Sequence, residues 1–142
     1  MTIQPVDVLY TAVATAENGR DGRVASDDGK LDVIVNPPRE MGGSGAGTNP
    51  EQLFAAGYSA CFQSALGAVA RADKTDISGS RVTAKVGLGK LPSGGYGLTV
   101  ELSVSLPNVP EATAKELVEK AHEVCPYSNA TRGNIEVRLS IA

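Results

Sequence analysis

A long run of apolar and small residues, 49–72, constrains the fold of this chain more than any other feature. Asn49 is the expected N-cap, because Pro50 disfavours helical angles for the residue before it and suits the first helical position itself. Gln52 lies where the second partner of a capping box would lie. The run has no wide polar face, and a helix of that kind is usually buried on most sides. We therefore expect a buried helix from Asn49 to about Ala72.

Alternating apolar and polar residues predict strands on both sides of this helix in the chain. Before the helix, residues 6–16, a short strand after the ENGRDGR turn, and residues 30–35 are expected to form a three-strand meander. After it, residues 81–89 and 96–106 alternate on either side of a PSGG turn, which predicts a hairpin. Residues 134–142 alternate again and predict a last strand.

A second helix is expected between the hairpin and the last strand. It begins near Pro110, and its apolar stripe runs on to Val124 and Cys125. Pro126 disfavours helical angles at Cys125, so the helix is expected to end there. The resulting order, β-β-β-α-β-β-α-β, favours an α+β fold in which two antiparallel three-strand groups surround the long helix.

The chain has 142 residues, which suits one domain over residues 1–142 with one core. So short a chain would have difficulty in covering the long apolar helix on every side, and we expect an intimate homodimer. The net charge is -3 and the basic residues are scattered, which argues against a nucleic-acid partner.

The N-terminal residues contain no basic run followed by an apolar block, so no signal peptide is expected. We also expect no membrane-spanning segment, because a span needs about 20 apolar residues. These two expectations place the protein in the cytoplasm. In that compartment thiols are kept reduced, and a disulfide is more often catalytic or sensing than structural.

The chain contains two cysteines, Cys61 within the apolar helix and Cys125 at the end of the second one. A free thiol has a pKa of about 8.5, and apolar surroundings raise that value. Cys61 is about three turns into its helix, too far from the N-terminus for the helix dipole to lower its pKa. A reactive Cys61 therefore needs a nearby cation. The candidates for this cation are Arg20, Arg23, Arg71 and Arg132.

From position alone, Arg20 is a turn arginine in solvent, Glu51 is a first-turn acid that complements the helix dipole, and Cys125 completes an apolar stripe. A functional interpretation makes Glu51 the charge partner of the arginine and the two cysteines an attacking and a resolving thiol. Glu51 and Cys61 are ten residues apart, about 15 Å along a straight helix. If both belong to one site, Glu51 is expected to come from a partner chain.

Three other kinds of site are weaker predictions. His122 precedes Cys125 by three residues, which is compatible with a Cys–His hydrolase, but a histidine is also favoured near a helix C-terminus by the dipole. Two cysteines and one histidine do not complete a structural zinc site without carboxylates. The glycine-rich loop 42–47 could hold an anion, although it lacks the lysine of a P-loop.

Three motifs, GRDGR, GTNPEQLFAAGYSACFQSAL and VCPYSNATRGNI, together resemble the organic hydroperoxide resistance proteins of the Ohr/OsmC family. The last motif is similar to the Ohr branch, and the resemblance covers nearly the whole chain. It implies an OsmC-like fold, an intertwined homodimer with two active sites at the interface, and thiol-based reduction of organic and fatty-acid hydroperoxides to alcohols.

The resemblance also implies a role for each of four residues. Cys61 would be the peroxidatic cysteine and Cys125 the resolving one. Arg20 would hold the thiolate and Glu51 would orient the guanidinium. It implies no bound cofactor and an external dithiol, the lipoyl group of a lipoylated protein, as reductant.

Apolar residues near Cys61 are candidates for the wall of a substrate pocket, with plain core packing as an equal alternative for each: Leu53, Phe54 and Phe62. A different class of protein also stays open, a small-molecule binding protein of the same fold whose cysteines are inert.

Overall fold

The computed structural model describes residues 3–142. The chain forms two compact units, Met1–Pro50 and Glu51–Ala142. The expectation of one domain over the whole chain therefore stays a prediction.

The N-terminal unit is a three-stranded antiparallel meander of β1 (Ala14–Glu17), β2 (Gly22–Ser26) and β3 (Asp32–Val35), followed by the short 3-10 helix η1 (Arg39–Met41). This confirms the predicted meander, but the prediction that its first strand covers residues 6–16 is wrong. Residues 3–13 form no strand, because a strand requires a hydrogen-bonded neighbour and β1 pairs with β2 only from Ala14 onwards. Their apolar side chains remain largely exposed.

The β1–β2 turn holds Arg20 and is as tight as the sequence predicts. The backbone N–H of Asp21 donates to the carbonyl of Asn18, 3.0 Å away, and Asn18 and Gly19 both adopt positive φ angles of 60° and 55°. At Gly22 a Cβ atom would lie 1.9 Å from a carbonyl oxygen across the turn. A side chain at Gly22 would therefore disrupt the turn that carries Arg20.

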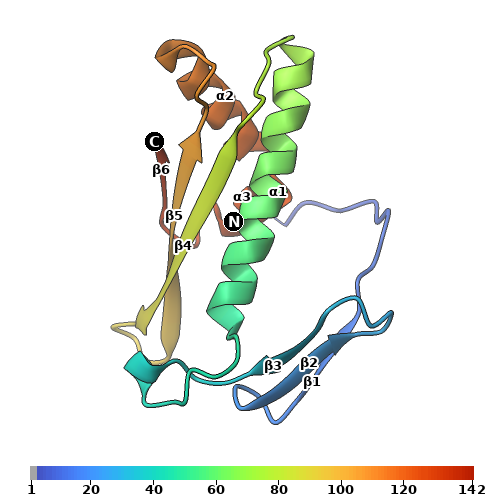
Figure 1. Ribbon diagram of the computed structural model, residues 1–142, viewed down its shortest axis with the longest axis vertical. Coiled ribbons are helices and arrows are strands. Elements are labelled where there is room, and N and C mark those ends of the chain that lie inside the picture. The colour runs from blue at the N-terminus through green and yellow to red at the C-terminus, as the bar shows by residue number, and fades with distance from the viewer. Residues whose placement is uncertain (1–2) are drawn as a thin grey trace. The chain divides into compact units, whose positions relative to one another are not determined.

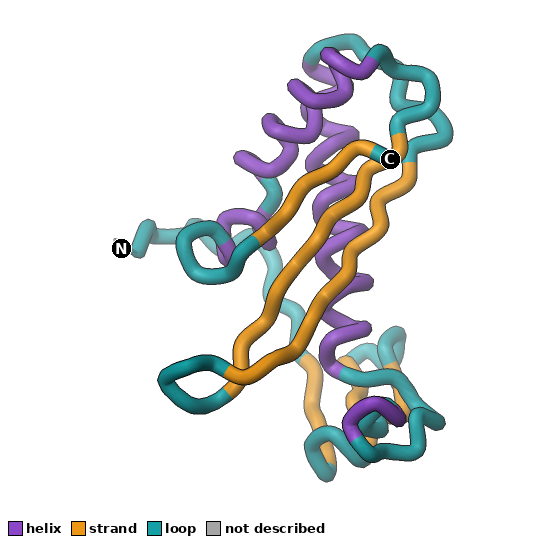
Figure 2. Tube along the Cα trace, turned by 90° about the vertical axis from the view of Figure 1, so that its left-hand side faces the viewer, coloured by secondary structure: helices purple, strands orange, loops and turns teal. Residues whose placement is uncertain are grey.

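The C-terminal unit is a three-stranded sheet with three helices. Its elements are α1 (Pro50–Ala72), β4 (Arg81–Lys90), β5 (Tyr96–Ser105), α2 (Glu111–Val124), α3 (Pro126–Thr131) and β6 (Val137–Ile141). The strand order is β4-β5-β6, and the two longer helices lie on one face of this sheet (Figures 1 and 2). The predicted long helix and the β4–β5 hairpin are confirmed.

Two features of this unit differ from the sequence predictions. β6 pairs with β5 in parallel, with Leu139 opposite Leu102, so the expectation of purely antiparallel sheets is wrong at this strand. The reason is that α2 and α3 connect β5 to β6 and return the chain to the end of the sheet at which β5 begins. The short helix α3 was not predicted; it begins at Pro126, whose ring suits the first helical position.

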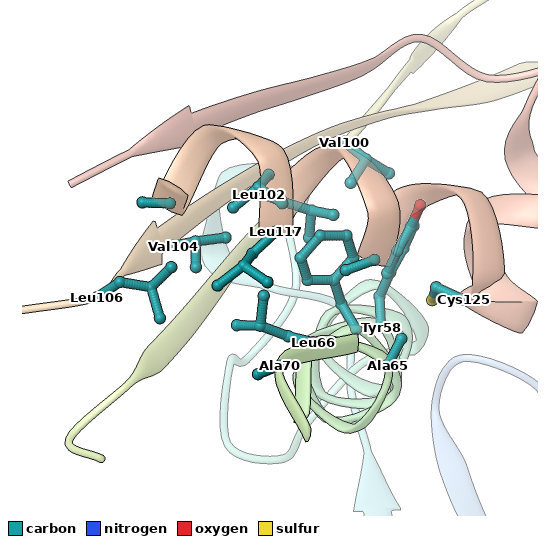
Figure 3. Close-up of a cluster of buried hydrophobic side chains, with 14 residues drawn as sticks. Tyr58, Ala65, Leu66, Ala70, Val100, Leu102, Val104, Leu106, Leu117 and Cys125 are labelled. Atoms are coloured by element: carbon teal, nitrogen blue, oxygen red, sulfur yellow. The ribbon is translucent and has the colours of Figure 1, made fainter. Parts of the chain in front are cut away.

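The core of the unit lies between α1, α2 and β5 (Figure 3). The fully or nearly buried apolar residues recur along one face of α1 and one face of β5: Tyr58, Phe62, Ala65, Leu66, Ala70, Val100, Leu102 and Val104. The predicted stripe of α2 is confirmed up to Ala121 and at Cys125, whereas Val124 is 52% exposed. Within one chain α1 is buried along one face only, so the expectation of burial on most sides is wrong for the single chain.

By length and composition α1 could cross a membrane, and the expectation that no segment reaches that length is therefore wrong. Core helices of soluble proteins meet the same criterion, and α1 packs against β5 and α2 along its buried face. Only 22% of its most apolar stretch is buried inside the chain, which leaves much small and apolar surface uncovered.

Candidate functional site

The two thiols meet at the contact between α1 and the corner that joins α2 to α3. The Sγ atoms of Cys125 and Cys61 are 3.6 Å apart, and both cysteines are free. Cys125 is fully buried beside Tyr58 (Figure 3), whereas Cys61 is half-buried. A disulfide requires an S–S distance of about 2.0 Å, so a short movement would bring the pair into bonding distance.

Cys125 occupies the α2–α3 corner itself. Its backbone N–H donates to the carbonyl of Ala121 in α2, and its own carbonyl accepts from the N–H of Asn129 in α3, both over 2.9 Å. Its backbone angles are extended, as expected for a residue before Pro126. The place of the Cys125 sulfur therefore depends on how both helices are held.

The surroundings of Cys61 act against its ionisation. Burial raises the pKa of its thiol, and the neighbouring Cys125 thiol adds to this effect. A hydrogen bond from the backbone N–H of Tyr127 to the sulfur acts in the opposite direction and only partly offsets it. This agrees with the expectation that a reactive Cys61 needs a cation from elsewhere.

Two of the alternative cations are engaged with other groups. Arg23 makes a two-pronged contact with Asp32 across β2 and β3, with N–O distances of 2.7 Å. Arg132 donates to the side chain of Asn129 and to the carbonyl of His122. Because of these contacts, Arg23 and Arg132 are weaker candidates for the cation beside Cys61 than the sequence alone suggested.

Arg20 lies in the β1–β2 turn of the N-terminal unit, and Glu51 lies in the first turn of α1. Because α1 is one uninterrupted helix from Pro50 to Ala72, the separation of about 15 Å along the helix between Glu51 and Cys61 stands. The roles of Arg20 and Glu51 at the thiols remain predictions.

An aromatic cluster lies one turn from Cys61 on α1. The ring of Tyr127 is 5.8 Å from Phe54 and 5.5 Å from Tyr58, and the two α1 rings are 6.0 Å apart. Gly57 makes room for Tyr127, because a Cβ atom there would lie 2.6 Å from the tyrosine hydroxyl. Tyr127, which sequence reasoning missed, therefore contacts both aromatic rings of α1, while its backbone N–H reaches the Cys61 sulfur.

The three predicted wall residues differ in burial. Leu53 and Phe54 are half-buried, so part of each side chain is accessible to a small molecule. Phe62 is fully buried in the core cluster, and the alternative of plain core packing describes it.

A buried polar network holds α3 against its neighbours. The Tyr58 hydroxyl lies 2.8 Å from Ser128 Oγ and 3.2 Å from Thr131 Oγ1, and His122 Nδ1 lies 2.7 Å from Ser128 Oγ. Sequence reasoning missed this network; its one signal was two polar residues, Ser128 and Thr131, on one face of a short helix.

His122 takes part in that network through its ring. Burial lowers the pKa of His122, and the charge of Arg132 lowers it further, while Glu123 acts in the opposite direction. Because Nδ1 contacts Ser128, the structure favours a supporting role for His122 over a Cys–His hydrolase.

The structure supports neither a zinc site nor an anion site in the glycine-rich loop 42–47. Residues 3–142 contain no group of three or more histidine, cysteine, aspartate or glutamate residues that could hold a metal ion. In the glycine-rich loop, a Cβ at Gly43 or Gly47 would lie 2.1 Å or 2.4 Å from a backbone carbonyl oxygen. Close backbone packing therefore accounts for these two glycines.

Comparison with known proteins agrees with this architecture. Residues 42–140 match the family described as OsmC-like protein. An organic hydroperoxide resistance protein of Xanthomonas axonopodis pv. citri is 55% identical over 140 residues, which cover 97% of this chain and 98% of its own. The organic hydroperoxide resistance protein OhrB of Bacillus subtilis is 47% identical over 134 residues, which cover 94% of this chain and 98% of its own.

Solved structures give the same result. An organic hydroperoxide resistance protein from Elizabethkingia anophelis superimposes with a TM-score of 0.92 at 53% identity, covering 96% of this chain and 99% of that one. OhrB of Bacillus subtilis superimposes with a TM-score of 0.88 at 46% identity, covering 95% and 100%.

The chain belongs to the OsmC-like protein family. Within that family it groups with the organic hydroperoxide resistance proteins, as the sequence motifs predicted. The α+β class, with two three-strand sheets and one long helix, is confirmed.

Proposed function

We propose that this protein is a thiol-dependent peroxidase that reduces organic hydroperoxides, both alkyl and fatty-acid, to alcohols. The single observation that carries the proposal is the 3.6 Å approach of the Cys61 and Cys125 sulfurs. The names of the relatives, organic hydroperoxide resistance proteins, support the substrate class.

In the proposed reaction the Cys61 thiolate attacks the terminal oxygen of the hydroperoxide. The O–O bond breaks, the alcohol departs and Cys61 becomes a sulfenic acid. The Cys125 thiol then condenses with it, water leaves, and a disulfide forms. An external dithiol, the lipoyl group of a lipoylated protein, reduces the disulfide by exchange, and the chain needs no bound cofactor for these steps.

Arg20 is proposed to supply the cation that a reactive Cys61 needs. Glu51 would orient the guanidinium by a two-pronged contact, for which arginine geometry is suited. To lower the thiol pKa by about two units, the thiolate must be stabilised preferentially by roughly 2.7 kcal/mol. One close, partly desolvated guanidinium can provide an interaction of that size.

The pocket wall is proposed to include Leu53 and Phe54, with Tyr127 added by the structure. Leu53, Phe54 and the ring of Tyr127 would favour alkyl peroxides over hydrogen peroxide, because they offer apolar surface to an alkyl group. Phe62 would support the wall from within the core.

We propose a homodimer in the cytoplasm. Small side chains at a spacing of four residues lie exposed along α1: Ala56, Ala60, Ser64 and Ala68. Small residues of this kind allow a second backbone to approach closely. Large apolar side chains of residues 3–13 are also exposed. A second copy would bury both surfaces and could supply Glu51 to the site of its neighbour.

The proposal is tested by steady-state turnover with a dihydrolipoyl dithiol. Wild-type protein should reduce an alkyl hydroperoxide much faster than hydrogen peroxide, and Cys61→Ser should abolish the activity. Absence of turnover in wild-type protein, together with saturable binding of apolar small molecules, would support a binding protein with inert cysteines instead.

A further inference from the structure

The α2–α3 corner is held by two contacts that run side by side from α1. Tyr58 and Cys61 are three residues apart on α1 and share a helix face. Cys125 and Ser128 are likewise three residues apart across the start of α3. One contact is the sulfur pair at 3.6 Å, which changes during the proposed reaction, and the other is the hydroxyl pair Tyr58–Ser128 at 2.8 Å, which does not.

Helix α3 has only six residues and therefore depends on contacts with other elements for its stability. Isolated helices shorter than about 12–15 residues are marginal in water. The buried side chains of α3 are Ser128 and Thr131, which are polar and 0% and 2% exposed. Their partners come from α1 and α2, so the buried polar network supplies much of the attachment of this helix.

The hydrogen bonds of the network can be satisfied together. The Thr131 hydroxyl donates to the carbonyl of Ser128, so its oxygen can accept from the Tyr58 hydroxyl. The Tyr58 oxygen can then accept from Ser128, whose oxygen accepts from Nδ1–H of His122. In residues 3–142 no buried side-chain nitrogen or oxygen lacks a partner. A fully satisfied buried network favours one arrangement of the groups that it joins.

We propose that Tyr58 is a positioning residue: its hydroxyl, through Ser128, fixes the α2–α3 corner so that the Cys125 sulfur stays within reach of Cys61. Tyr58 does not touch the peroxide in this account. It acts through the Cys125 segment and governs how fast the Cys61 sulfenic acid is captured. The inference rests on the proposed peroxidase function and adds the residue that controls its second step.

Capture competes with over-oxidation. In the capture step, Cys61–S–OH and Cys125–S–H combine to a disulfide and one water, and no further oxidant is needed. In the competing step a second hydroperoxide oxidises the sulfenic acid to a sulfinic acid and leaves as its alcohol. If Cys125 spends less time within reach, the ratio of disulfide to sulfinic acid falls, while the first oxidation of Cys61 is unaffected.

Tyr58→Phe is the most direct test, because it removes the hydroxyl and keeps the ring packed between Phe54 and Tyr127. Ser128 retains its contact with His122 in this variant. Tyr96→Phe is the matched control, since Tyr96 is 67% exposed on β5 and makes the same chemical change away from the site.

Each protein is reduced, mixed with increasing alkyl hydroperoxide and followed by intact mass. Tyr58→Phe should lose Cys61 thiol as fast as wild type but form sulfinic acid at roughly five- to tenfold lower peroxide excess, the factor that one lost buried hydrogen bond represents. Tyr96→Phe should match wild type. A role in stability alone would lower the melting temperature of Tyr58→Phe without changing the ratio of the two products.

A folded Tyr58→Phe that closes its disulfide as efficiently as wild type would overturn the proposal. Should Tyr58→Phe fail to fold, Ser128→Ala, which breaks the same link from the α3 side, decides the question by the same ratio. A wild-type protein that forms no disulfide would instead reject the proposed function, so the two failures are distinguishable.

Discussion

Cys61 lies in surroundings that oppose its own ionisation. Burial and the adjacent Cys125 thiol raise the pKa of Cys61, and the N–H of Tyr127 is the group that lowers it from within the C-terminal unit. The proposed chemistry therefore depends on a cation close to the Cys61 sulfur. Arg20 is the residue assigned to supply it.

Arg20→Ala should raise the pKa of Cys61, because the thiolate loses its stabilising cation. The pKa is measured from thiolate absorbance against pH in a Cys125→Ser background, so that one thiol is titrated. Arg23→Ala is the control, since Arg23 is an exposed arginine of the same sheet paired with Asp32. Equal titrations for Arg20→Ala and its parent would remove Arg20 from the site.

His122 gives a pH-dependent contribution to stability. Its folded-state pKa is lowered, first by burial and then by Arg132, so the unfolded chain binds the proton more readily. Stability should therefore fall as the pH drops below about 6.5, the ordinary histidine value, and the fall should level off below the folded-state pKa. His122→Gln should lack this part of the acid destabilisation.

The measurement is urea unfolding of wild type and His122→Gln between about pH 8 and about pH 5. The difference in free energy of unfolding, wild type minus variant, should decrease towards acid pH. A difference that stays constant over this range would show that His122 does not titrate differently in the folded and unfolded states.

At the scale of elements, the sequence predicted the helices and strands whose residues carry strong local signals. Pro50 marks the start of α1, and the unbroken alternation of residues 96–106 predicts β5 with its correct inward face. The core position of Leu102 follows from this alternation, and the structure places Leu66 of α1 in the same core. Leu66→Ala should therefore cost about 2–5 kcal/mol of unfolding free energy, because it leaves a cavity between α1 and β5.

Leu91→Ala is the control for this substitution, because Leu91 is 46% exposed just beyond β4. It should lower the free energy of unfolding by a small fraction of the Leu66→Ala effect. Equal losses in the two variants would contradict the placement of Leu66 in the core.

Other features of the elements could not be predicted, because they depend on contacts distant in sequence. The parallel pairing of β6 follows from the path of α2 and α3, not from the alternation of β6 itself. The end of α2 was predicted from Pro126, but the same proline also starts α3. The polar residues of α3, Ser128 and Thr131, do not reveal from the sequence which groups they contact in the core. Likewise, residues 6–16 alternate like a strand, yet this segment pairs with its neighbour β2 only from Ala14 onwards.

The sequence named the residues of the candidate site but not their geometry. The resemblance assigned Cys61 and Cys125 their roles, and the structure places their sulfurs 3.6 Å apart, which no spacing of 64 residues reveals. Tyr58 and Tyr127 were missed because their importance comes from contacts between α1 and α3.

At the scale of the whole molecule, the exposed small residues of α1 predict a dimer. Sedimentation equilibrium of the wild-type protein should give twice the chain mass of 14.6 kDa. Ala60→Glu should shift this equilibrium to the monomer, because it places a charge on the face where a second helix would pack. Ala112→Glu, at an exposed alanine of α2, should remain dimeric.

A monomeric wild-type protein at micromolar concentration would contradict the dimer. Dissociation of both variants to the same extent would show that added charge, and not the α1 face, is responsible.

The central claim is that an organic hydroperoxide oxidises Cys61 and that Cys125 then closes onto it. Intact mass spectrometry after one equivalent of an alkyl hydroperoxide tests this most directly, with Cys125→Ser treated in parallel. The account predicts that the wild-type chain loses two hydrogens, whereas Cys125→Ser gains one oxygen. An unchanged wild-type mass, with both thiols still open to alkylation after denaturation, would contradict it.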